Sequence, residues 1–127
     1  MVSVTFANGK NIEVLNDTVV RPSGMSTVRN KMEIHVVKDA MSLDEFVALF
    51  SEEALKEIRI KEVADDKTQY DIRYTDYGII ASIGLQRVEK YDVASSQIET
   101  AVHLVAVLEQ YTYIEKQLKA MGVNITA

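Results

Sequence analysis

Residues 100–108 read TAVHLVAVL, and residues 111–118 read YTYIEKQL. The first segment carries β-branched and other apolar side chains on both faces, which favours a strand that runs to about Leu108. In the second segment the apolar residues recur at helical spacing, namely Tyr111, Ile114, Leu118 and Met121. The sequence therefore predicts a final strand followed by a C-terminal helix over residues 109–122, with Gly122 as its C-cap.

A different structure is open for the same region. Ser96 and Glu99 have the spacing of a capping box, the arrangement that starts many helices. One continuous helix from Gln97 to Met121 is therefore the alternative to a strand followed by a helix.

The composition is that of one ordinary globular domain covering residues 1–127. The chain is 47% hydrophobic and 26% charged, and its net charge of −5 argues against nucleic acid as a partner. It contains no cysteine, which excludes disulfides and thiolate metal sites. Since no segment approaches the roughly 20 apolar residues of a membrane span, we expect no membrane partner and a protein made in the cytoplasm.

The N-terminal segment predicts a β-hairpin. Apolar residues alternate at Val2, Val4 and Phe6, and Asn8-Gly9 is a strong turn signal. A two-residue turn would split the apolar residues between the two faces, so we predict an extra residue near Lys10, as a bulge or a three-residue loop. This register pairs Phe6 with Ile12, and Val4 with Val14.

The middle of the chain alternates between strands and turns. Residues 16–30 are predicted to form an exposed loop, and Ser42 and Glu45 a capping box that starts a short helix, Leu43–Phe50. Further strands are expected at residues 32–36, 58–60, 70–74 and 79–85, the last buried and bulged at Gly84. The fold class is therefore α+β: a β-rich antiparallel sandwich or partly open barrel of about six or seven strands, with one short crossing helix and a C-terminal helix.

No motif for catalysis, a metal or a cofactor is present, so none is assigned. His35 and His103 both lie in predicted strands, which could bring them together as a base or as ligands, but structural or solvated roles are favoured. Asp65, Asp66 and Asp71 resemble part of a calcium loop, yet they lack its glycine and its bidentate glutamate, so a turn explains them better.

The C-terminal helix is the main candidate for contact with another protein. Its stripe of Tyr111, Ile114, Leu118 and Met121 either packs on the domain's own sheet, which we favour slightly, or docks on a neighbouring subunit. The loop over residues 16–30 is a second candidate surface, through Arg21 and Arg29.

As a whole, the chain resembles small proteins encoded in the tail and baseplate regions of prophages from Gram-positive bacteria. The resemblance rests on the order and pattern of segments rather than on a catalytic motif. It is carried by residues Val4–Leu15, Met32–Ile34, Leu43–Ser51, Tyr74–Tyr77 and Thr112–Leu118.

The resemblance implies a non-enzymatic structural or assembly protein of a phage tail or baseplate. Its expected partners are other tail or baseplate proteins and copies of itself, first in the host cytoplasm and then in the virion tail. One alternative is a tail-morphogenesis chaperone that is absent from the finished particle. A weaker alternative is a small hydrolase that uses His35 or His103.

Overall fold

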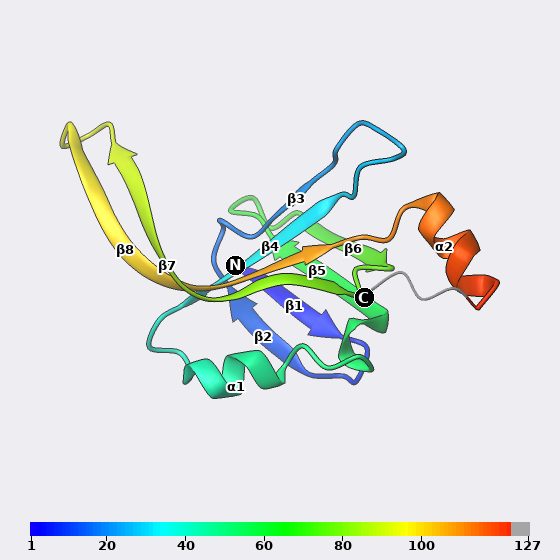
Figure 1. The fold of residues 1–127 in the computed structure, drawn as a ribbon. Coiled ribbons are helices and arrows are strands. Elements are labelled where there is room, and N and C mark those ends of the chain that lie inside the picture. Colours follow the sequence, from blue (N-terminus) through cyan, green and yellow to red (C-terminus); the bar gives the residue numbers. More distant parts are fainter. Residues whose placement is uncertain (123–127) are drawn as a thin grey trace.

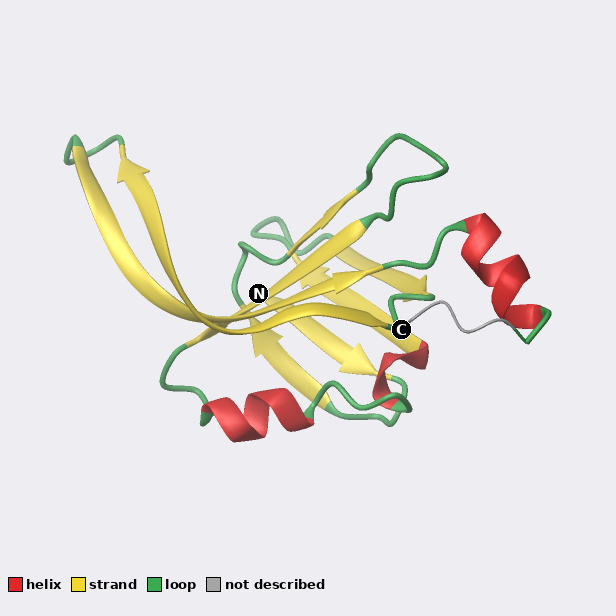
Figure 2. Ribbon diagram, viewed as in Figure 1, coloured by secondary structure: helices red, strands yellow, loops and turns green. Residues whose placement is uncertain are grey.

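The computed structural model describes residues 1–122. Two four-stranded antiparallel sheets face each other in a β-sandwich that is not closed into a barrel (Figures 1 and 2). The elements, in chain order, are β1 (Val2–Phe6), β2 (Asn11–Val14), β3 (Val19–Arg21), β4 (Lys31–Val37), α1 (Leu43–Ala48), the 3-10 helix η1 (Ala54–Lys56), β5 (Glu57–Val63), β6 (Gln69–Thr75), β7 (Ile79–Asp92), β8 (Gln97–Glu109) and α2 (Tyr113–Ala120). The predicted α+β class and sandwich are confirmed.

The first and last strands of the chain, β1 and β8, belong to different sheets. The first sheet has the order β2-β1-β5-β6, and the second has the order β3-β4-β8-β7. Residues 97–108 form a strand, so the alternative of one long helix from Gln97 is wrong. The part predicted as a loop over residues 16–30 contains the short strand β3, which pairs with β4.

Alternating apolar residues of the two sheets supply the core between them. Phe46 of α1 is fully buried, and its ring lies 5.1 Å from that of Phe50, which lies 5.5 Å from that of Phe6. The other large, fully buried side chains are Met32, Ile34, Ile58, Leu104, Leu108, Val4 and Val36. These edge-to-face aromatic contacts anchor the short helix α1 to the β1 hairpin, because aromatic rings bury a large apolar area.

The first hairpin has the predicted three-residue loop but a different register. Val4 pairs with Ile12 and Val2 with Val14, so the predicted pairing of Phe6 with Ile12 is wrong. Phe6 instead exchanges backbone hydrogen bonds with the turn, and Gly9 adopts a φ of 86°. The shift is two residues, which leaves the apolar side chains on the same face because side chains alternate with period two.

Two local predictions need correction. The bulge in β7 lies between Ile80 and Ser82, not at Gly84, which pairs regularly with Val105. At α1, Ser42 Oγ accepts a hydrogen bond from the Glu45 amide, whereas the Glu45 carboxylate accepts from the Ser42 hydroxyl. Ser42 is therefore an N-cap, but the predicted capping box is incomplete.

Candidate functional site

A long two-stranded ribbon projects from the body of the sandwich. The pairing of β4 with β8 ends at Val37 and His103, whereas β7 and β8 remain paired as far as Asp92 and Gln97. We call residues 86–102 the arm; Figure 1 shows it extending away from the two sheets. Among residues 1–122, no third strand pairs with the arm, and an isolated two-stranded ribbon is at best marginally stable in water.

The large exposed apolar side chains on the strands of the arm, Tyr91, Ile98 and Val102, lie on one of its two faces, while Val88 and Ala101 pair on the other. Residues paired across an antiparallel ladder share a face, and Leu85 pairs with Leu104, a residue of the core. The same face continues outward through the pairs Arg87–Val102, Glu89–Thr100 and Tyr91–Ile98. It is exposed: the exposed fractions are 54% for Leu85, 63% for Tyr91 and 65% for Ile98. The core-facing side of β7 and β8 thus extends beyond the sheet that covers it.

The first sheet leaves a similar surface uncovered. Val4 pairs with Ile60, and Ile60 with Ile72 of β6, so these residues share the face that contains the core. β6 is an edge strand, and Tyr70 and Ile72 on it are each about half exposed. In each sheet, therefore, part of the face that elsewhere packs in the core is exposed to solvent.

The helix α2 begins with a complete capping box. Thr112 accepts a hydrogen bond from the Glu115 amide at 3.2 Å, and the Glu115 carboxylate accepts one from the Thr112 amide. This signal, a threonine followed three residues later by glutamate, was present in the sequence but was not used in predicting where the helix starts. The helix begins at Tyr113 rather than near residue 109.

An ion-pair network fixes α2 against the loop before β4. The Arg29 guanidinium donates from Nε to Glu115 Oε1 at 3.0 Å and from Nη1 to Glu109 Oε1 at 3.2 Å. The hydrogen bond from Arg29 lowers the pKa of Glu115 to about 2, against the opposing effect of burial. Arg29 is thus an internal tether, whereas Arg21 lies exposed on β3 and pairs with Glu33.

The predicted contact stripe of the C-terminal helix is divided between the body and the surface. Tyr111 is buried, and its amide donates to the Asp76 carbonyl at 2.9 Å. Leu118 is half-buried, while Ile114 and Met121 are exposed, with exposed fractions of 54% and 77%. Beside this helix an open hollow of about 510 Å³ is lined by Thr27, Val28, Arg29, Lys31, Glu109 and Glu115.

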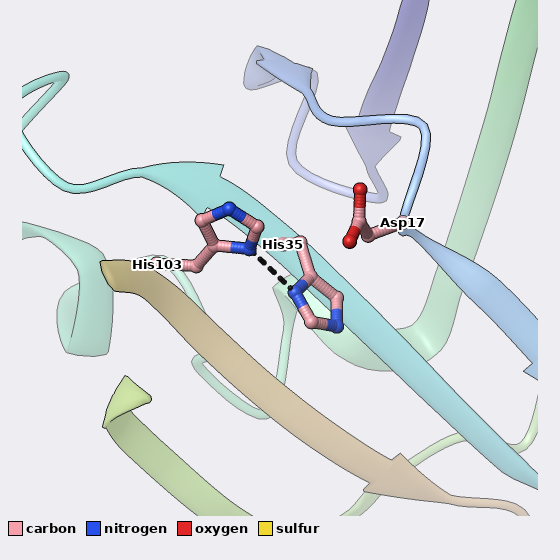
Figure 3. Close-up of side chains that lie close together, drawn as sticks. All are labelled: Asp17, His35 and His103. Carbon is pink, nitrogen blue, oxygen red and sulfur yellow. Dashed lines mark hydrogen bonds between the residues drawn. The ribbon is translucent and has the colours of Figure 1, made fainter. Parts of the chain in front are cut away.

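The two histidines meet on the outer face of the second sheet. His35 of β4 and His103 of β8 lie on adjacent strands, their Nδ1 atoms are 3.0 Å apart, and the rings are edge to face at 87° (Figure 3). Both side chains are buried, with exposed fractions of 5% and 7%. Solvated roles for them are therefore excluded, and the possibility that the strands bring them together is confirmed.

A turn between β2 and β3 brings Asp17 to this pair. The Leu15 amide donates to the His35 carbonyl at 2.8 Å, and the His35 amide donates to Thr18 Oγ1 at 3.0 Å. These bonds fix the turn at residues 15–18 against β4. The donor atoms of Asp17, His35 and His103 all lie within 4.8 Å of one another.

Burial and neighbouring charges shift the pKa values of His103 and Asp17. Burial lowers the pKa of His103, which favours a neutral imidazole, and the carboxylate of Asp17 only partly opposes this effect. Burial raises the pKa of Asp17, but the Lys90 ammonium, which donates to its Oδ1 at 2.6 Å, more than offsets the effect and the pKa is lowered. The cluster therefore places the Asp17 carboxylate beside a His103 side chain whose neutral imidazole form is favoured.

Among residues 1–122, no helix is long and apolar enough to cross a membrane. The turn at Asp65 and Asp66 closes through two backbone hydrogen bonds, from the Ala64 amide to the Thr68 carbonyl and from the Lys67 amide to the Ala64 carbonyl, as expected for a hairpin turn. Comparison with known proteins finds no matching family model, no matching curated protein and no matching solved structure.

Proposed function

We propose that this chain is a non-enzymatic structural or assembly protein of a phage tail or baseplate, acting through protein–protein contacts. Two kinds of support are combined. The sequence resemblance supplies the phage context, and the arm supplies the contact surface. The arm is the observation that carries the proposal, because a protein that acts alone gains nothing from extending a half-apolar ribbon into water.

The partner that best fits the arm is another copy of the chain. The apolar face around Tyr91 and Ile98 matches in chemistry the uncovered face of β6, which carries Tyr70 and Ile72. Because these are two different surfaces, their contact would be heterologous, joining each copy to the next. Such contacts close into a ring or continue as a filament, and both are suited to a tubular or ring-shaped particle.

Burial of apolar side chains would supply part of the free energy of this contact. Burying Tyr91 and Ile98 would contribute about 1.5–3 kcal/mol per side chain before association costs are subtracted. Docking would also protect the arm, whose two strands pair with no third strand of the described chain and are held to the turn at residues 15–18 by the Lys90–Asp17 ion pair. α2, with Ile114 and Met121 exposed, is a second candidate surface for tail neighbours.

Hydrolysis through the histidines is less well supported. His35 and His103 are close together, as that alternative requires, but each exposes less than a tenth of its side chain. A catalytic base must come within hydrogen-bonding distance of a bound substrate, and this burial leaves little surface for one.

Quantitative mass spectrometry of purified phage particles tests the proposal. The expected result is the chain at a fixed ratio to tail components, in particles purified from an induced culture of the host that encodes it. Presence in the lysate with absence from particles would instead indicate a chaperone that leaves before maturation. Absence of any association with tail proteins would overturn the phage context.

A further inference from the structure

We propose that Asp17, His35 and His103 form a binding site for a first-row divalent transition metal ion, with zinc as the best-fitting ion. The three residues come from three separate segments: the turn at residues 15–18, β4 and β8 (Figure 3). A bound ion would therefore clamp the turn to two strands of the second sheet. This inference is independent of the phage context.

The distances suit a small metal ion. Zinc takes nitrogen and oxygen ligands at about 2.0–2.2 Å, so two donor atoms in a tetrahedral site lie about 3.3 Å apart. The Nδ1 atoms of His35 and His103 are 3.0 Å apart, and the Asp17 oxygen lies within 4.8 Å of both. Asp17 is on a turn, so a small rotation of its side chain would complete a three-residue set with a fourth position for water.

A hydrogen bond with Glu33 orients the ring of His35. His35 Nε2 lies 3.4 Å from Glu33 Oε1, and the other oxygen of Glu33 accepts a bond from Arg21 Nε at 2.7 Å. A carboxylate acts only as an acceptor, so this contact places the proton of His35 on Nε2 and leaves Nδ1 with a lone pair. Metal-binding histidines commonly have this arrangement, with a carboxylate on the ring nitrogen opposite the ion.

The close approach of the two imidazoles also supports the site. With His35 Nδ1 as acceptor, the His103 Nδ1–H group donates across the 3.0 Å contact when no ion is bound. A metal ion would replace that single proton between the rings and bind both nitrogens. His103 would then carry its proton on Nε2 instead.

The donor set selects the class of ion. Two imidazoles with one carboxylate suit zinc and its transition-metal neighbours, whereas magnesium and calcium prefer sites made of oxygen ligands. Lys90 competes for Asp17, because its ammonium already binds Oδ1. A metal would use the second oxygen, Oδ2, so we expect binding weaker than in zinc sites with four protein ligands.

Calorimetric titration of the metal-stripped, tag-free chain with zinc chloride tests the site. The expected result is one zinc ion per chain and an increase in the melting temperature. Asp17→Asn and His103→Gln are each expected to weaken binding at least about tenfold, and Glu33→Gln about 10–100-fold through the orientation of His35. Asp39→Asn is the matched control: an exposed aspartate of another turn, whose loss should leave zinc affinity unchanged.

Nitrogen NMR of the imidazoles supplies a readout that does not depend on affinity. On zinc addition, the Nδ1 signals of both His35 and His103 should shift together. The Nε2 signal of His103 should become that of a protonated nitrogen, and the Nε2 signal of His35 should remain that of one. Because His103 is buried, circular dichroism first establishes that each variant folds. If His103→Gln does not fold, Asp17→Asn still tests the site, because Asp17 lies on a turn. Absence of one-to-one binding, or equal zinc affinity in Asp17→Asn and the parent chain, would overturn the proposal.

Discussion

Tyr91 and Ile98 face each other across the arm, on the same side of the ribbon as the buried Leu104. Both are more than 60% exposed, with no second sheet over them. The alternation of apolar and polar residues that forms the core therefore continues into the arm, where nothing in the described chain covers the apolar side chains. This relationship links the fold to the proposed function.

A matched glycine pair tests the packing of Tyr111. A methyl group added at Gly78 would lie 3.1 Å from Tyr111 Cε2, whereas one added at Gly84 would meet no atom within 4 Å. Gly78→Ala is expected to lower the free energy of unfolding by about 1–3 kcal/mol, because the buried ring must move. Gly84→Ala should leave it unchanged or raise it by about 0.5–1 kcal/mol. Urea denaturation of both variants measures the difference, and equal stabilities would show that Tyr111 is not held tightly.

The Arg29–Glu115 pair predicts how α2 responds to acid. The pKa of Glu115 is lowered from 4.5 to about 2, so the stabilisation is complete above about pH 4.5 and is lost as the pH falls toward 2. Solvent screens the pair because Arg29 is 31% exposed, and we expect a contribution of about 1–2 kcal/mol rather than the full value of the shift.

Carbon NMR of the Glu115 carboxyl group measures this directly. In Arg29→Gln the pKa should move back up toward 4.5, and hydrogen exchange of the α2 amides at neutral pH should become faster. Lys56→Gln serves as the control, since Lys56 pairs with the distant Glu53. A Glu115 pKa that is the same with and without Arg29 would contradict the tether.

A substitution in α2 distinguishes whether the helix is part of the domain's core or a surface for contact with a neighbouring subunit. Leu118 is half-buried and no residue of α2 is fully buried, so Leu118→Asp is expected to leave the domain folded. Leu108→Asp, which places a charge at a fully buried core position, should prevent folding. Circular dichroism and thermal melting distinguish the two variants. Loss of the folded state in Leu118→Asp would assign α2 to the core.

The sequence predicted the sandwich because most strands alternate strictly between apolar and polar residues. The strand predicted at residues 32–36 lies within β4, where Met32, Ile34 and Val36 are buried in the core. The strand after Gly78 was expected to be short and buried, but β7 continues to Asp92 and none of its residues is fully buried. Local alternation cannot show whether a face will be covered, because the covering sheet comes from distant segments.

The histidine cluster could not be predicted for the same reason, because its residues come from segments far apart in the sequence. His35 and His103 are separated by 68 positions, and only the pairing of β4 with β8 makes them neighbours. Asp17 was missed because its turn lies in a segment without periodicity, and only its bonds to the backbone of His35 bring it near. A short motif could not have revealed this set of three.

Sedimentation velocity of the purified chain over a range of concentrations tests the central claim, which is that the arm binds another copy. We predict that the parent chain forms oligomers as its concentration rises. Ile98→Asp, on the apolar face of the arm, should remain monomeric, while Ala101→Asp, on the opposite face of the same strand, should oligomerise like the parent. A parent chain that stays monomeric, or oligomers that persist in Ile98→Asp, would contradict the claim.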